Sequence, residues 1–85
     1  MMKNKILVEI SIPLIDETFD MYIPLNKNVA NIIQLICKAI NEINRIEDIN
    51  FSSMRLYNDE TALAYSPDII IKESNIRNGT RLILM

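Results

Sequence analysis

The chain has 85 residues, a formal net charge of −2 at pH 7 and no histidine. This length suits one domain, so we expect residues 1–85 to form a single domain around one hydrophobic core. The net negative charge argues against a partner whose phosphates must be neutralised by basic residues, so nucleic acid is not expected as a ligand. Without histidine, the sequence lacks the commonest general base and metal ligand.

Two runs of alternating apolar and polar residues open the chain. The first runs from Lys5 to Ser11 and the second from Thr18 to Leu25. Pro13 ends the first run, because proline has no N–H to donate to a neighbouring strand. Alternation with a period of two predicts half-buried strands, and the short link predicts an antiparallel hairpin. One face of this hairpin is expected to carry Ile6, Val8, Ile10, Ile12, Phe19, Met21, Ile23 and Leu25.

The spacing of apolar residues becomes helical after Asn28. From Val29 to Ile43 the apolar residues recur at intervals of one and three positions, with polar residues between them. This pattern predicts an amphipathic helix of about four turns whose apolar stripe covers the hairpin. Asn28 is a suitable N-cap, because its side chain can accept a hydrogen bond from a backbone N–H of the first turn. Leu35 and Ala39 are expected to widen the buried stripe.

Short elements follow the helix. The polar stretch from Asn44 to Ser53 is expected to be a loop held to the core by one or two of Ile46, Ile49 and Phe51. Proline, glycine and clustered polar residues mark the boundaries of the later elements. The predicted order is a strand at Met54–Tyr57, a turn at Asn58–Thr61, a brief strand around Leu63 and Tyr65, a helical or 3₁₀ turn at Lys72–Ser74, a turn at Asn78–Gly79 and a last strand at Thr80–Met85.

The order strand, strand, long helix, strand, short strand, turn and strand resembles ubiquitin. The chain is most similar to the small ubiquitin-like proteins of the YukD/EsaB family, which are cytosolic accessory components of type VII (WXG100) secretion systems in Gram-positive bacteria. The final segment resembles the family ending S-G-I-x-x-G-x-x-L, with Asn75 in place of the first glycine. The matching segments are Val8–Pro13, Phe19–Pro24, Val29–Ala39 and Glu73–Leu84.

This resemblance implies an α+β fold, a ubiquitin-like β-grasp with a mixed four- to five-stranded sheet and one long helix packed on one face. The first and last strands would then lie side by side in parallel, with the third strand next to the last. The family carries no catalytic residues, so the resemblance implies a non-catalytic protein-interaction module. We therefore expect an accessory or regulatory role in a type VII secretion system, with a component of that machine as the protein partner.

Few side chains in this sequence are suited to chemistry. Cys37 is the one thiol, and it would be either a nucleophile or redox sensor or a small apolar residue on the inner stripe of the helix; we favour the second. The acidic pairs Asp16–Glu17 and Asp59–Glu60 fall in predicted turns, where carboxylates are solvated. We expect no catalytic residue, no metal and no cofactor, and therefore not an enzyme.

Outward-facing apolar residues form the candidate site. In a β-grasp, the side chains expected to face the helix are those of Val8, Ile10, Leu56, Leu82 and Leu84. Because side chains alternate along a strand, their neighbours would form a protein-binding patch on the opposite face. This patch would consist of Leu7, Tyr57, Ile83 and Met85, with Tyr57 as an anchor. Alternatively, these residues are ordinary surface, or the Asn44–Ser53 stretch folds over them.

Other functions stay open at this point. A homodimer would bury the same outward face without a secretion partner. A ubiquitin-like modifier or sulfur carrier needs a thin Gly-Gly tail, whereas this sequence ends on Met85 next to a strand, which disfavours that class. A regulatory domain of an unrelated complex is a further alternative. The sequence has a single cysteine, Cys37, and shows neither an apolar stretch of about 18 residues nor a signal-peptide pattern. These features predict a cytoplasmic protein without membrane insertion.

Overall fold

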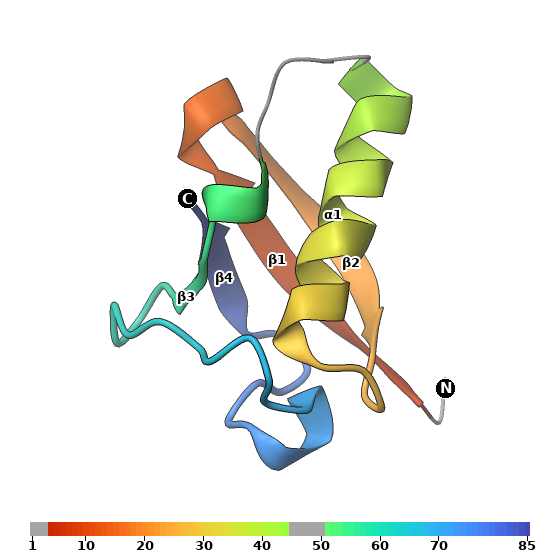
Figure 1. Ribbon diagram of the computed structural model, residues 1–85, viewed down its shortest axis with the longest axis vertical. Coiled ribbons are helices and arrows are strands. Elements are labelled where there is room, and N and C mark those ends of the chain that lie inside the picture. Colours follow the sequence, from red (N-terminus) through yellow and green to blue (C-terminus); the bar gives the residue numbers. More distant parts are fainter. Residues whose placement is uncertain (1–3, 45–50) are drawn as a thin grey trace.

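One helix packs across one face of a four-stranded sheet in the computed structural model, which describes residues 4–44 and 51–85 (Figure 1). The strands are β1 (Lys5–Ile12), β2 (Glu17–Pro24), β3 (Leu56–Asn58) and β4 (Arg81–Leu84), and the helix is α1 (Val29–Asn44). Three short 3₁₀ helices complete the described elements: η1 (Pro13–Ile15), η2 (Phe51–Ser53) and η3 (Ile71–Glu73).

The sheet has the strand order β2-β1-β4-β3. β1 pairs with β2 in antiparallel and with β4 in parallel, and β3 pairs with β4 in antiparallel. The parallel pairing of the first and last strands and the position of the third strand are therefore confirmed. So is the α+β, ubiquitin-like β-grasp, because the sheet is mixed and one helix covers one of its faces.

The core lies between α1 and the inner face of the sheet. The five strand residues predicted to face the helix are at most 1% exposed. Isoleucine dominates this core, and its branched side chain suits both a pleated strand and close packing. The buried apolar residues are Val8, Ile10, Ile12, Ile23, Val29, Ile32, Ile36, Ile40, Leu56, Ile71, Ile76, Leu82 and Leu84.

The start of α1 is anchored by its own cap and by a distant loop. The predicted N-cap is confirmed, since the Asn28 Oδ1 atom accepts a 2.9 Å hydrogen bond from the N–H of Asn31. The N–H of Val29 donates to the carbonyl of Ile69, and that of Ala30 to the carbonyl of Pro67. Three of the first N–H groups, which have no partner inside a helix, are thus satisfied. These bonds tie the helix to the segment that precedes η3.

Replacing Asn28 by alanine should lower the free energy of unfolding by about 1 kcal/mol, because the N–H of Asn31 loses its acceptor. Urea denaturation followed by circular dichroism measures this change. Asn28→Ser, which keeps a capping oxygen, is the matched control and should recover most of the lost stability. Equal losses in the two variants would show that the cap does not stabilise α1.

Two residues of α1 lie on its flanks instead of on its buried stripe. Successive helix residues are rotated by about 100°, so when Ile36 points into the sheet its two neighbours point sideways. Leu35 is consequently 38% exposed, and its predicted place in a widened buried stripe is wrong. Cys37, on the other flank, is only partly buried. The stripe widens only as far as Ala39, which is half-buried.

A polar network fixes the chain after β3. The buried Asn58 accepts hydrogen bonds at Oδ1 from the N–H groups of Glu60 and Thr61, at 2.8 and 3.1 Å. Its Nδ2 donates to the Tyr65 hydroxyl at 2.9 Å, and that hydroxyl donates to the Asn75 Oδ1 atom at 2.6 Å. Because the Asn58 side chain turns the chain, β3 ends at Asn58, one residue later than predicted.

Two further expectations change in this half of the molecule. The brief strand predicted around Leu63 and Tyr65 is reduced to one bridge, between Tyr57 and Ala64. Of the predicted loop after α1, residues 51–53 form η2 instead. Residues 45–50 lie outside the described residues, as does the packing predicted for the side chains of Ile46, Ile49 and Phe51.

Gly79 makes the predicted turn before β4. Its φ of +90° lies in the region that glycine adopts without strain. The N–H of Thr80 donates to the carbonyl of Arg77 at 3.0 Å and closes a β-turn. The neighbouring Asn78 Oδ1 atom accepts from the N–H of Leu7, and the N–H of Gly79 donates to the carbonyl of Leu7. The turn thereby sets where β4 begins beside β1.

Candidate functional site

The candidate site is the outer face of the sheet, on the side away from α1. Strand alternation and the pairing registers arrange its side chains in rows that run across the strands. These rows differ in chemistry, so each is described in turn. The residues of this face are Leu7, Glu9, Ser11, Thr18, Asp20, Tyr22, Tyr57, Arg81, Ile83 and Met85.

One row holds two of the predicted patch residues. Ile83 lies between Tyr57 on β3 and Ser11 on β1, and Ser11 lies opposite Thr18 on β2. Ile83 and Tyr57 are each half-buried. The hydroxyls of Ser11 and Thr18 are 3.2 Å apart and form a hydrogen bond with each other. This row therefore changes from apolar on β3 and β4 to hydroxyl on β1 and β2.

Met85 extends the apolar end of that row. It lies two residues beyond Ile83, about 7 Å along the strand. Its backbone pairs with Arg55 in both directions, with N···O distances of 2.9 and 3.1 Å. The side chain of Met85 is 54% exposed. The structure thus brings Tyr57, Ile83 and Met85 together at the β3–β4 edge, and we call these three residues the edge patch.

Leu7 is not part of the edge patch. Ser11 is level with Ile83, and Leu7 lies four residues before Ser11, about 13 Å along β1. A charged row separates the two positions, with Glu9 opposite both Asp20 and Arg81. The predicted four-residue patch is therefore divided.

Leu7 instead lies opposite Tyr22, which is 51% exposed and was missed by the sequence reasoning. The signal that would have found Tyr22 is its outward place in the second alternating run, combined with the register of the hairpin. The outer face consequently has two apolar areas, one at each end, with the charged row between them.

Cys37 has the chemistry of a protected thiol. Partial burial raises its pKa from 9.0 to about 11, although a backbone hydrogen bond acts in the opposite direction. The thiol is therefore protonated at neutral pH, whereas a nucleophilic cysteine needs a lowered pKa. Within residues 4–44 and 51–85, no group of three or more Cys, Asp or Glu side chains is placed to hold a metal ion.

The reaction of Cys37 with Ellman's reagent at pH 8 should be at least about tenfold slower in the folded protein than in urea, because the thiolate is the reacting form. The folded rate should keep rising as the pH approaches about 11, and the unfolded rate should level off above 9.0. Since the unfolded chain ionises first, the folded state should also lose stability across this window. Comparison with Cys37→Ala isolates the part of the pH-dependent stability loss that comes from this thiol. Equal reaction rates in the folded and unfolded protein would contradict the assignment of Cys37 as a protected thiol.

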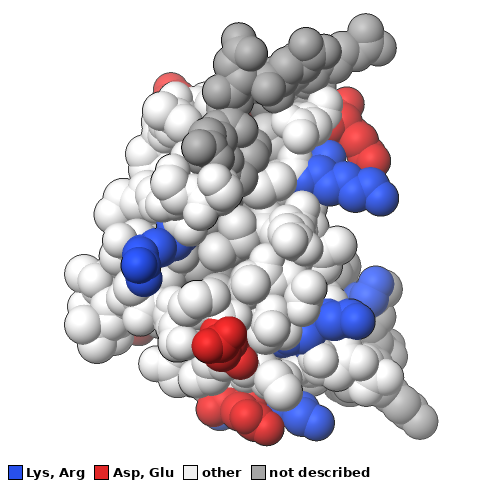
Figure 2. All heavy atoms as spheres, in the orientation of Figure 1, with Lys and Arg blue, Asp and Glu red and all other residues white. Residues whose placement is uncertain are grey.

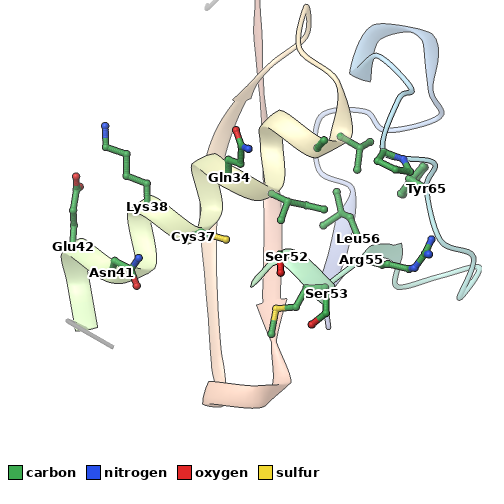
Figure 3. Close-up of a pocket in the computed structure, with 15 residues that line it drawn as sticks. Gln34, Cys37, Lys38, Asn41, Glu42, Ser52, Ser53, Arg55, Leu56 and Tyr65 are labelled. Atoms are coloured by element: carbon green, nitrogen blue, oxygen red, sulfur yellow. The ribbon is translucent and has the colours of Figure 1, made fainter. Parts of the chain in front are cut away.

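A groove opens on the other side of the molecule, between α1 and the β3 side of the sheet. It has a volume of about 890 Å³. Figure 3 shows the sulfur of Cys37 directed across the groove toward the side that carries Ser52, with Lys38 and Arg55 at opposite outer edges of the groove. Its lining residues are Val29, Ala30, Ile33, Gln34, Cys37, Lys38, Asn41, Glu42, Ser52, Ser53, Met54, Arg55, Leu56, Tyr65 and Pro67.

Comparison with solved structures identifies a ubiquitin-like fold. The EccD5 ubiquitin-like domain from Mycobacterium xenopi has a TM-score of 0.76 at 16% identity, covering 95% of this chain and 92% of that one. Ubiquitin from Caldiarchaeum subterraneum has a TM-score of 0.69 at 11% identity, covering 94% and 90%. A chain of the MycP5-free ESX-5 inner membrane complex has a TM-score of 0.77 at 15% identity, covering 96% of this chain and 21% of that one. At these identities the likeness shows the fold alone.

Sequence comparison adds no closer relative. No protein-family model matches the chain, and no curated protein matches it either. Within its described residues, the chain contains no helix that is both long and apolar enough to span a bilayer.

Proposed function

We propose that the chain is a non-catalytic protein-interaction module that serves as a cytosolic accessory or regulatory component of a type VII secretion system. It would act by docking the outer face of its sheet onto another component of the machine. The partner is a protein, and the interaction needs no cofactor.

The observation that carries this proposal is the edge patch. The edge patch consists of three apolar residues that lie together on the outer face of the sheet, Tyr57, Ile83 and Met85. Their inward-facing neighbours fill the core, so these three side chains are not part of it. An aromatic side chain beside aliphatic ones is the usual centre of a protein interface. The charged row and the hydroxyls of Ser11 and Thr18 would form its polar rim.

The choice of pathway is supported by two independent likenesses. The closing segment of the sequence resembles the ending of the YukD/EsaB family. The fold is similar to an EccD5 ubiquitin-like domain and to part of a chain in an ESX-5 inner membrane complex. A fold similar to this one therefore occurs in a chain of an ESX-5 inner membrane complex, and we propose a type VII secretion machine as the setting of this chain.

Affinity purification of the tagged full chain from its native host, after chemical cross-linking, tests this function. The proposal predicts that a component of a type VII secretion machine is recovered, and that it is absent from a strain carrying the tag alone. Recovery of an unrelated enzyme complex, and of no secretion component, would contradict the proposal.

The intact mass of the chain purified from its native host without cross-linking tests the modifier class. A ubiquitin-like modifier or sulfur carrier would show a covalent adduct on a fraction of the chain, whereas an interaction module has the mass of the unmodified chain. Light scattering after size exclusion tests the homodimer in the same sample. A stable dimer that masks the edge patch would mean that a second copy of the chain, and not a secretion partner, binds the edge patch.

A further inference from the structure

The groove between α1 and the β3 side is a second surface, separate from the edge patch. Its volume of about 890 Å³ lies within the roughly 300–1,000 Å³ typical of ligand-binding clefts. The apolar side chains of its lining that are partly exposed include those of Ala30, Ile33 and Met54. Figure 2 shows an uncharged hollow in the middle of this face, with basic side chains on either side of it.

The walls of the groove offer no free strand edge. The N–H of Tyr65 donates to the carbonyl of Leu56 at 2.9 Å, and that of Asn58 to the carbonyl of Leu63 at 3.0 Å, so residues 63–65 close the outer edge of β3. On the other wall, the backbone groups of a helix are paired within the helix. An extended peptide would therefore leave its own backbone groups unpaired here. A helix pairs its backbone N–H and C=O groups internally, so it avoids the free-energy cost of leaving them unpaired.

The length and charge of the groove define the helix that fits. The lining residues of α1 run from Val29 to Glu42, about 20 Å along the helix axis and thus three to four turns. Lys38 and Arg55 lie on opposite walls, and both side chains are exposed. Glu42 is the one acidic residue of the lining and lies one helical turn after Lys38, at the same end of the groove (Figure 3). Acidic side chains on the incoming helix would complement the two basic ones.

We propose that this groove binds an amphipathic α-helix of three to four turns from a partner protein. The apolar stripe of that helix lies on the partly exposed Ile33, Cys37 and Met54, and its acidic side chains lie beside Lys38 and Arg55. Helix-in-groove recognition of this kind uses apolar anchors at intervals of three and four residues. The groove lies on the α1 side of the sheet and the edge patch on the outer face, and the two adjoin at Arg55, whose backbone pairs with Met85. The groove proposal does not rest on the function proposed for the edge patch.

Two synthetic 14-residue peptides test the proposal against the ¹⁵N-labelled full chain. Both carry leucine at positions 1, 4, 8 and 11 and alanine elsewhere, except that one has glutamate and the other lysine beside each leucine. The glutamate peptide should shift the amide resonances of Ile33, Cys37 and Leu56 and bind at least about tenfold more tightly than the lysine peptide. The double variant Lys38→Glu/Arg55→Glu should reverse this preference. Lys27→Glu/Lys72→Glu, which changes the net charge equally but lies outside the groove lining, should keep it.

Several outcomes would overturn the helix proposal. These are equal binding of the two peptides, shifts confined to the outer sheet face, or no binding of either. Binding of decanoate in the groove without binding of the glutamate peptide would identify an acyl chain as the occupant. Concentration-dependent shifts of the groove without peptide would identify a second copy of the chain. The Tyr57→Ala/Ile83→Asp variant should still bind the glutamate peptide, which separates this result from a failure of the edge patch.

Discussion

The double substitution Tyr57→Ala/Ile83→Asp is expected to abolish binding to the secretion partner while the domain remains folded. It removes the aromatic anchor and places a charge in the centre of the edge patch. Truncation of a hot-spot residue at the centre of an interface costs about 2 kcal/mol or more, so the loss of two such residues lowers the affinity by roughly a thousandfold. Both side chains face away from α1, so the core keeps all of its residues. Calorimetric titration with the purified partner measures the affinity, and circular dichroism verifies the fold.

The matched control places the same kinds of change away from the edge patch. Leu14 and Leu63 are exposed apolar residues in η1 and in the segment after β3. The variant Leu14→Asp/Leu63→Ala should bind with the affinity of the unchanged protein. If Tyr57→Ala/Ile83→Asp binds equally well, the partner contacts another surface and the edge patch is ordinary surface.

The second large effect concerns the core. Leu82 is 1% exposed at the centre of β4, where it lies opposite Ile10 of β1 and Asn58 of β3. Replacing it by alanine removes apolar contacts and leaves a cavity, which should lower the free energy of unfolding by about 2–5 kcal/mol. A domain of this size is stable by only roughly 5–15 kcal/mol, so Leu82→Ala should unfold at a much lower urea concentration.

Leu63→Ala is the same chemical change at a position that is 69% exposed. It should alter the free energy of unfolding by less than about 0.5 kcal/mol. Thermal and urea unfolding of the two variants compare the positions directly. Similar decreases in the free energy of unfolding of Leu82→Ala and Leu63→Ala would mean that the Leu82 side chain of β4 does not face the core.

Sequence periodicity predicted the hairpin and the helix because both are set locally. Period two identifies a half-buried strand and a mixed interval of three and one identifies an amphipathic helix, whichever partner each element later meets. The capping role of Asn28 was also predictable, since the bond spans only three residues. The inward direction of Leu82 and Leu84 followed from the alternation of β4 once the resemblance had supplied the sheet order.

The candidate site was only partly predictable because it depends on registers between distant strands. Leu7 and Ile83 are 76 positions apart in the sequence. The bonds of Leu7 with Asn78 and Gly79, together with the bond from the Glu9 N–H to the Thr80 carbonyl, set where β4 lies along β1. Leu7 consequently lies apart from the edge patch, beside Tyr22. The groove was not predicted either, since it requires the flank of α1 that carries Cys37 to face residues after position 51. No pattern within either segment indicates that approach.

Site-specific photo-cross-linking in the native host tests the central claim most directly. A photoreactive amino acid is placed in turn at Ile83 in the edge patch, at Leu63 as an exposed control and at Gln34 on the rim of the groove. The edge patch predicts that position 83 cross-links to a component of the secretion machine and that position 63 does not. A secretion component captured from position 63 but never from position 83 would contradict the docking of this face.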